Sequence, residues 1–79
     1  MEIEVRLFAT LQEYVPMGEM RHTFKLAVEE GTQIEDILTR LKIPEKMPKI
    51  LLVNGKYAPK DSVLQPGDVL SIFPPLGGG

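Results

Sequence analysis

The chain has 79 residues, nine basic and eleven acidic side chains, a formal net charge of −2 and no cysteine. A single domain of this size buries only about 60% of its unfolded surface, and without cysteine it has no disulfide, thiol nucleophile or cysteine-based metal site. The charge balance argues against nucleic-acid binding, and no apolar run approaches the roughly 20 residues that span a bilayer. Met1 leads directly into a strand-like pattern, so we expect no secretion signal. We therefore expect a cytoplasmic protein that binds proteins or small molecules and neither nucleic acid nor membrane.

The first third of the sequence predicts two strands joined by a helical turn. Apolar and polar side chains alternate in residues 2–9, as in a half-buried strand, and Phe8 lies on the outward face of that strand. Residues 10–13 fit a capping box that opens one helical turn. Residues 23–28 alternate again and predict a second strand. The inward residues of the two strands are Ile3, Val5, Leu7, Ala9, Phe24, Leu26 and Val28.

The middle of the sequence contains the one strong helix signal. Thr32 is a candidate N-cap, and Glu35 three residues later completes a capping box. The apolar residues that follow have the i, i+3, i+4, i+7 spacing of one buried stripe. They are Ile34, Ile37, Leu38 and Leu41. Pro44 is expected to stop the helix, because proline disfavours helical geometry at the residue before it.

The last third predicts three more strands. Residues 50–53 form a continuous apolar run, which is typical of a strand covered on both faces. Asn54 and Gly55 predict a tight turn into a short edge strand at residues 56–57. Residues 66–68 predict another turn, and residues 69–73 form the last strand.

The order strand, strand, helix, strand, short strand, strand predicts an α+β fold. A β-grasp, ubiquitin-like roll fits best: a mixed sheet of four or five strands with one main helix. A ferredoxin-like fold needs a second full helix, and the turn at residues 10–14 is too short to supply one. We expect residues 1–74 to form the β-grasp domain and residues 75–79 a flexible glycine tail.

The tail is where the sequence places the chemistry. The chain ends in Phe73, Pro74, Pro75, Leu76, Gly77, Gly78 and Gly79. The two prolines favour an extended path away from the sheet, and the last six residues can reach roughly 20 Å into a narrow channel of a partner. A glycine carboxylate has no Cβ to crowd it. Glycines alone also fit a frayed terminus, but a stiff spacer directly after a core strand favours a functional tail.

Four segments carry a resemblance to a known family: residues 5–9, 53–55, 64–68 and 73–79. In the same order they resemble the MoaD/ThiS family of sulfur carriers, and most of all the MoaD-type small subunit of molybdopterin synthase. The resemblance spans nearly the whole chain, and the tail is its most specific part. The triple-glycine ending is also similar to ThiS, and Lys60 stands where the family often has an apolar residue.

The resemblance implies a mechanism. A MoeB-like adenylyltransferase would use ATP to convert the carboxylate of Gly79 into an acyl-adenylate, and a sulfur donor would then leave a thiocarboxylate there. The tail, residues 74–78, would enter a MoaE-like large subunit in a heterotetramer, which transfers the sulfur to a pterin precursor. The chain would bind no cofactor itself and would not be catalytic alone. The resemblance also implies that Phe8, Tyr57 and Phe73 dock the partners. In a β-grasp sheet the first and last strands are parallel neighbours, so Phe8 and Phe73 would form one outward patch beside the tail.

Other residues give no site. His22 is the only histidine, and its neighbours suggest neither catalysis nor metal binding. The acidic residues lie in turns or at a helix start, where they have local roles. Three alternatives to the molybdopterin role stay open: a carrier for thiamin or another sulfur pathway, a ubiquitin-like modifier attached to lysine, and a non-catalytic β-grasp interaction module.

Overall fold

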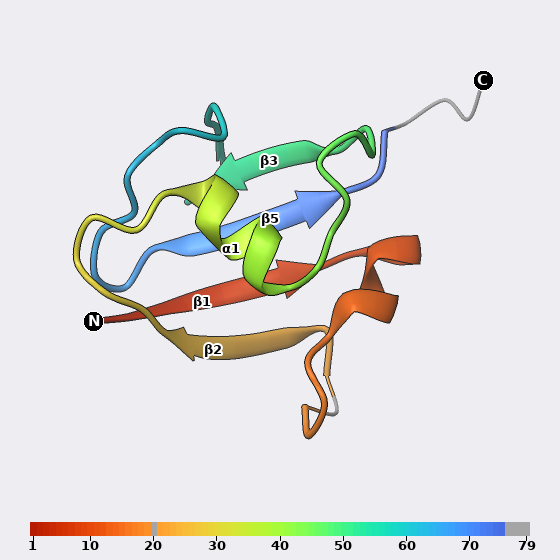
Figure 1. Cartoon of the computed structure of the whole chain (residues 1–79), viewed down its shortest axis with the longest axis horizontal. Coiled ribbons are helices and arrows are strands. Elements are labelled where there is room, and N and C mark those ends of the chain that lie inside the picture. The colour runs from red at the N-terminus through yellow and green to blue at the C-terminus, as the bar shows by residue number, and fades with distance from the viewer. Residues whose placement is uncertain (20, 76–79) are drawn as a thin grey trace.

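The computed structural model describes residues 1–19 and 21–75 of the chain. In this part five strands form one mixed sheet in the order β2-β1-β5-β3-β4, and the helix α1 crosses one face of it (Figure 1). The elements are β1 (Glu2–Leu7), the 3-10 helix η1 (Ala9–Tyr14), β2 (Thr23–Ala27), α1 (Ile34–Arg40), β3 (Ile50–Val53), β4 (Lys56–Tyr57) and β5 (Val69–Phe73). This is the β-grasp roll predicted from the element order.

The central pair of the sheet is β1 and β5, which run parallel as expected. Their register aligns Val5 with Leu70 and Leu7 with Ile72. β2 and β3 flank this pair and are antiparallel to it. Because β1 and β5 run in the same direction, their carboxyl ends lie at the same end of the sheet. The residue after β1 and the start of the tail therefore lie close together.

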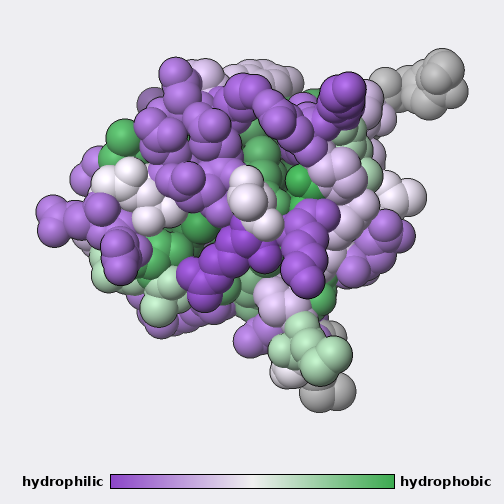
Figure 2. Space-filling model, in the orientation of Figure 1, coloured by the Kyte–Doolittle hydropathy of each residue, from purple (hydrophilic) through white to green (hydrophobic). Residues whose placement is uncertain are grey.

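The core lies between the sheet and α1. The alternating residues of the strands and the apolar stripe of the helix are buried, as predicted from their spacing. The members of these two sets are Ile3, Val5, Leu7, Phe24, Leu26, Ile34, Ile37, Leu38, Leu41, Leu70 and Ile72. Complete burial of one such side chain stabilises the fold by about 1.5–3 kcal/mol. On the α1 side of the molecule polar residues cover most of the surface, with apolar residues visible in the hollows (Figure 2).

The helix α1 differs from its prediction at both ends. Gln33, not Thr32, is the N-cap: its N–H donates to Asp36 Oδ2 at 2.8 Å, and the Asp36 N–H donates to the Gln33 carbonyl at 3.0 Å. The Thr32 hydroxyl instead donates to the Glu29 carbonyl at 2.6 Å, so it is engaged in the preceding turn. At the other end Lys42 has a φ of 63°, and this left-handed residue ends the helix before any effect of the later proline.

The turn after β1 also differs from its prediction. Ala9, expected on the inward face of the strand, has a φ of 54° and is exposed at the start of η1. The N-cap of η1 is Phe8, without a side-chain hydrogen bond, so the capping box expected from Thr10 does not form. Leu11 is buried and holds the turn against the core.

The turn between β3 and β4 forms as predicted, and it is tied to the start of β5. Asn54 and Gly55 have φ values of 53° and 84°, as the two-residue hairpin turn requires. Asn54 Nδ2 donates to Asp68 Oδ1 at 2.9 Å, and the Val69 N–H donates to Asn54 Oδ1 at 2.9 Å. One asparagine therefore serves the turn and joins two neighbouring segments of the sheet.

Two substitutions separate these roles of Asn54. Asn54→Gly keeps the left-handed backbone but loses both side-chain hydrogen bonds, and we expect a loss of about 1 kcal/mol in the free energy of unfolding. Asn54→Ala loses the same hydrogen bonds and keeps a Cβ at positive φ, without the local side-chain hydrogen bonds that make this conformation accessible to asparagine, and we expect a loss of about 2 kcal/mol. Urea unfolding measures both. Lys56→Ala in the same hairpin is the control, with a change within about 0.5 kcal/mol. Equal losses for the two Asn54 variants would contradict the backbone part of this account.

Candidate functional site

The tail leaves the sheet directly after β5. Pro74 is half-buried and Pro75 is exposed, and Figure 1 shows the chain turning away from the sheet at the end where β1 also ends. The proline rings fix φ and remove two backbone donors, so this stretch cannot extend the sheet ladder. Leu76, Gly77, Gly78 and Gly79 lie outside the described residues, so their roles in tail insertion and activation stay predictions.

Two aromatic side chains stack at the root of the tail. The ring centroids of Phe8 and Phe73 are 4.2 Å apart, and the ring planes differ by only 4°. The pairing follows from the parallel register: Leu7 lies opposite Ile72, and the N–H of Phe8 donates to the Ile72 carbonyl at 3.1 Å. Both phenyl rings are half-buried. The outward aromatic patch expected beside the tail is therefore present.

The patch belongs to a larger apolar area on the open face, which we define as the sheet face opposite α1. β3 places Ile50 opposite Phe73, and Leu52 opposite Ser71 and Tyr57, so all of these side chains project from the open face. We call Phe8, Ile50, Leu52, Tyr57 and Phe73 the apolar half of this face. Tyr57 is 82% exposed. It lies across β3 from β5, so it shares the face with Phe73 but is not part of the aromatic stack.

The sequence analysis did not predict that Ile50 and Leu52 lie at the surface. Their continuous apolar run suggested a strand covered on both faces. All four residues of β3 are instead only half-buried. Ile50 and Leu52 lie on the open face, which no described element covers, and Leu51 and Val53 pack only partly against the core on the other face. The sequence did carry one signal: the hairpin turn at Asn54 and Gly55 implies an antiparallel pairing of this strand, and antiparallel strands often leave one face open.

The other half of the open face is charged. Arg6 Nε donates to Glu4 Oε2 at 2.6 Å, and Glu2 lies 4.0 Å from Lys25 across β1 and β2. Such partly exposed pairs contribute at most about 1 kcal/mol to stability. These charged side chains of β1 and β2 mark where the apolar half ends. The apolar half is therefore limited to β5, β3, β4 and the aromatic stack.

The lone histidine and the acidic side chains are not brought together in the part of the chain that the structure describes. His22 is exposed, with its ring centroid 5.7 Å from that of Phe8. Within residues 1–19 and 21–75 no three His, Asp or Glu side chains are grouped to hold a metal ion. No helix in the same part of the chain is long and apolar enough to cross a membrane.

Comparisons with known proteins place this geometry in a family. The model of the ThiS family matches residues 5–79. A search of curated protein sequences gives no match. Among solved structures, the HVO 2177 protein of Haloferax volcanii is 28% identical, with a TM-score of 0.78 over 100% of this chain and 87% of that one. SAMP1 from the same organism is 26% identical, with a TM-score of 0.74 over 99% of both chains.

A third solved structure shares the fold. It is a protein–protein complex of subunits 1 and 2 of molybdopterin-converting factor from Helicobacter pylori, matched at 24% identity and a TM-score of 0.62 over 100% of both chains. At this identity the likeness concerns the fold alone.

The aromatic stack is testable by a double-mutant cycle. We expect the combined loss in unfolding free energy for Phe8→Ala and Phe73→Ala to differ from the sum of the single losses by about 1 kcal/mol, because the two rings contact each other directly. A second cycle between Phe73→Ala and Tyr57→Ala is the control, and there we expect additivity. Urea unfolding of the variants gives both values. Additive losses in the first cycle would show that the two rings do not interact in solution.

Proposed function

Because this chain belongs to the ThiS family, we propose that it is a sulfur carrier whose Gly79 carboxylate is activated and converted to a thiocarboxylate. More specifically, we propose that it is the small, sulfur-donating subunit of molybdopterin synthase in molybdenum cofactor biosynthesis. The observation that supports this most is the stack of Phe8 and Phe73 at 4.2 Å, directly at the root of the Pro-Pro tail. An exposed apolar patch beside an extended end suits a partner that holds the domain and takes up the tail.

The chemistry begins in an activating partner. A carboxylate oxygen of Gly79 attacks the α-phosphorus of ATP, pyrophosphate leaves, and an acyl-adenylate forms. Hydrosulfide from the sulfur donor then attacks the acyl carbon, AMP leaves, and loss of the sulfur-bound proton gives the thiocarboxylate. The chain contributes the reactive carboxylate and its access, because glycines at the end leave no side chain near the acyl carbon. The partner contributes ATP binding and the acid–base groups, so this chain binds no cofactor and is not catalytic alone.

Three kinds of partner follow from this proposal. A MoeB-like adenylyltransferase activates Gly79, a sulfur donor supplies the nucleophile, and a MoaE-like large subunit receives the charged tail in a heterotetramer. The Helicobacter pylori complex of subunits 1 and 2 supports the last of these, since this chain shares the fold seen there. Phe8, Tyr57 and Phe73 dock these partners, and residues 74–78 carry the acyl group into their active sites. These reactions take place in the cytoplasm.

A second candidate is attachment to other proteins. It is favoured by the 26% identity to SAMP1 over 99% of both chains, a protein for which a further solved structure gives the full name small archaeal modifier protein 1. The activation step is the same, but the nucleophile is then a lysine amine, and the product is an isopeptide bond. The acceptor of the activated group thus separates the two candidates.

Intact-protein mass spectrometry tests the carrier chemistry. After incubation with a MoeB-like adenylyltransferase, ATP and a sulfide donor, we expect a mass gain that matches the replacement of one oxygen by sulfur, located in the peptide that contains Gly79. A truncated chain without Gly78 and Gly79 is the matched control and should gain nothing. Conjugates to lysine in place of this gain would favour the modifier function. A folded chain that several activating enzymes leave unchanged would contradict both and favour the interaction module.

Tyr57→Ala tests the docking role without disturbing the fold. The side chain is 82% exposed, so we expect a change in unfolding free energy within about 0.5 kcal/mol. We also expect kcat/KM for thiocarboxylate formation to fall about tenfold, because aromatic side chains in interfaces often contribute 1 kcal/mol or more. Val63→Ala is the control, since Val63 is also an exposed apolar residue, at 50%, but lies next to the start of α1. Equal effects of the two substitutions would argue against docking through the apolar half.

A further inference from the structure

The charges of the chain are strongly divided between two parts of the sequence. Residues 42–60 contain five lysines and one acidic residue, a net charge of +4. The other 60 positions contain four basic and ten acidic residues, a net charge of −6. The small net charge of the chain is therefore the sum of one basic region and an otherwise acidic sequence. We call residues 42–60 the basic edge.

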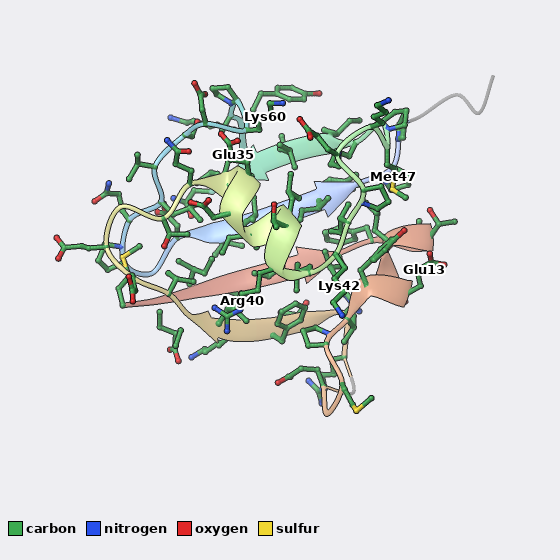
Figure 3. All side chains as sticks on the ribbon, viewed as in Figure 1. Glu13, Glu35, Arg40, Lys42, Met47 and Lys60 are labelled. Carbon is green, nitrogen blue, oxygen red and sulfur yellow. The ribbon has the colours of Figure 1, made fainter. Side chains whose placement is uncertain are left out.

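The fold places one end of the basic edge, the connector that leads into Ile50, beside the tail. It consists of the connector after α1, the strands β3 and β4, and the first residues after β4. Because Ile50 lies opposite Phe73, the connector reaches the sheet where the tail departs. Figure 3 shows Met47 of the connector near the point where the chain leaves β5, and Lys60 near Glu35 at the start of α1. The basic edge also contributes Ile50, Leu52 and Tyr57 to the apolar half of the open face.

The lysines of this edge are only partly neutralised within the chain. Lys60 Nζ lies 3.4 Å from Glu45 Oε1, in a pair whose side chains are both well exposed. Lys49 Nζ donates to the carbonyl oxygens of Met47 and Glu45, at 2.6 and 3.2 Å. Lys46 and Lys56 are exposed and form no ion pair with any residue of the described part. Much of this positive charge thus faces solvent.

A hollow on the α1 side concentrates part of that charge. It has a volume of about 380 Å³ and is lined by Lys42, Lys49 and Lys60, with Glu35, Glu45 and apolar residues of α1 and the connector. Burial and the nearby ammonium of Lys60 lower the pKa of Lys49, while Glu45 acts in the opposite direction. A negatively charged group of a partner, placed beside this hollow, would reduce the repulsion between Lys49 and Lys60.

We propose that the partner surface that receives the tail is apolar where it meets Phe8, Tyr57 and Phe73, and acidic where it faces the basic edge. This inference rests on the proposed carrier function and specifies the chemistry of its activating partner. The two features meet at one edge of the sheet, because Tyr57 of β4 projects from the open face and the neighbouring Lys56 projects toward the α1 side. Opposite charges beside an apolar contact speed association and select the orientation in which the tail meets its channel.

Charge reversal within the basic edge tests the inference. The variant K46E/K56E changes the two lysines without an internal ion pair, and the variant R21E/K25E is its control on the opposite edge of the sheet. Each changes the net charge by the same amount, so an effect of total charge would be equal in both. The measured quantity is kcat/KM for thiocarboxylate formation by the MoeB-like enzyme, at salt concentrations from about 0.05 to about 0.5 M. Thermal melting confirms that each variant is folded.

We expect K46E/K56E to lower kcat/KM about tenfold at low salt and the control variant to change it less than about twofold. The difference should shrink at high salt, and kcat at saturation should be unchanged. If all three proteins are converted with equal kcat/KM, the carrier function stands and the acidic-partner inference is overturned. If the wild type is not converted at all, the carrier function itself fails. Binding of the wild type to a DNA oligonucleotide, lost in K46E/K56E, would assign the basic edge to nucleic acid and also overturn the inference.

Discussion

The parallel pairing of β1 and β5 is the constraint on which the rest of the molecule depends. It places two fully buried rows of side chains at the centre of the sheet, with Val5 against Leu70 and Leu7 against Ile72. The same register brings the end of β1 to the end of β5, so that Phe8 stacks on Phe73. The pairing of β1 with β5 therefore positions both the surface aromatic rings and the root of the tail. A shift of one residue would turn these side chains to the wrong faces.

The two faces of the sheet differ in what covers them. The face under α1 is a closed apolar core that holds the fold, and the open face carries an apolar half and a charged half. A domain this small buries little apolar surface for its stability. It nevertheless leaves Tyr57 82% exposed and Ile50 and Leu52 half-buried. Apolar surface that is left open beside a glycine tail is consistent with a protein that works while held by a partner.

Local sequence patterns predicted the elements well and their exact ends less well. The stripe of Ile34, Ile37, Leu38 and Leu41 was sufficient to place α1, because a helical period leaves few alternatives. The cap was predicted one residue too early, since Thr32 and Gln33 can both accept hydrogen bonds and the turn at Glu29 had already engaged the Thr32 hydroxyl. Competition between neighbouring polar groups is not visible in the residue types alone.

The sequence by itself determined the β-grasp order of elements, the Asn54-Gly55 turn, and the Pro-Pro-Leu-Gly-Gly-Gly ending. These depend on local properties: alternation, helical period, and the backbone preferences of proline and glycine. Only the tertiary structure decided that Phe8 and Phe73 stack in parallel planes, that Ile50 and Leu52 reach the surface, and that the connector after α1 meets the sheet beside the root of the tail. These features depend on which strands pair and in which register, and such long-range contacts join residues that are far apart in the chain.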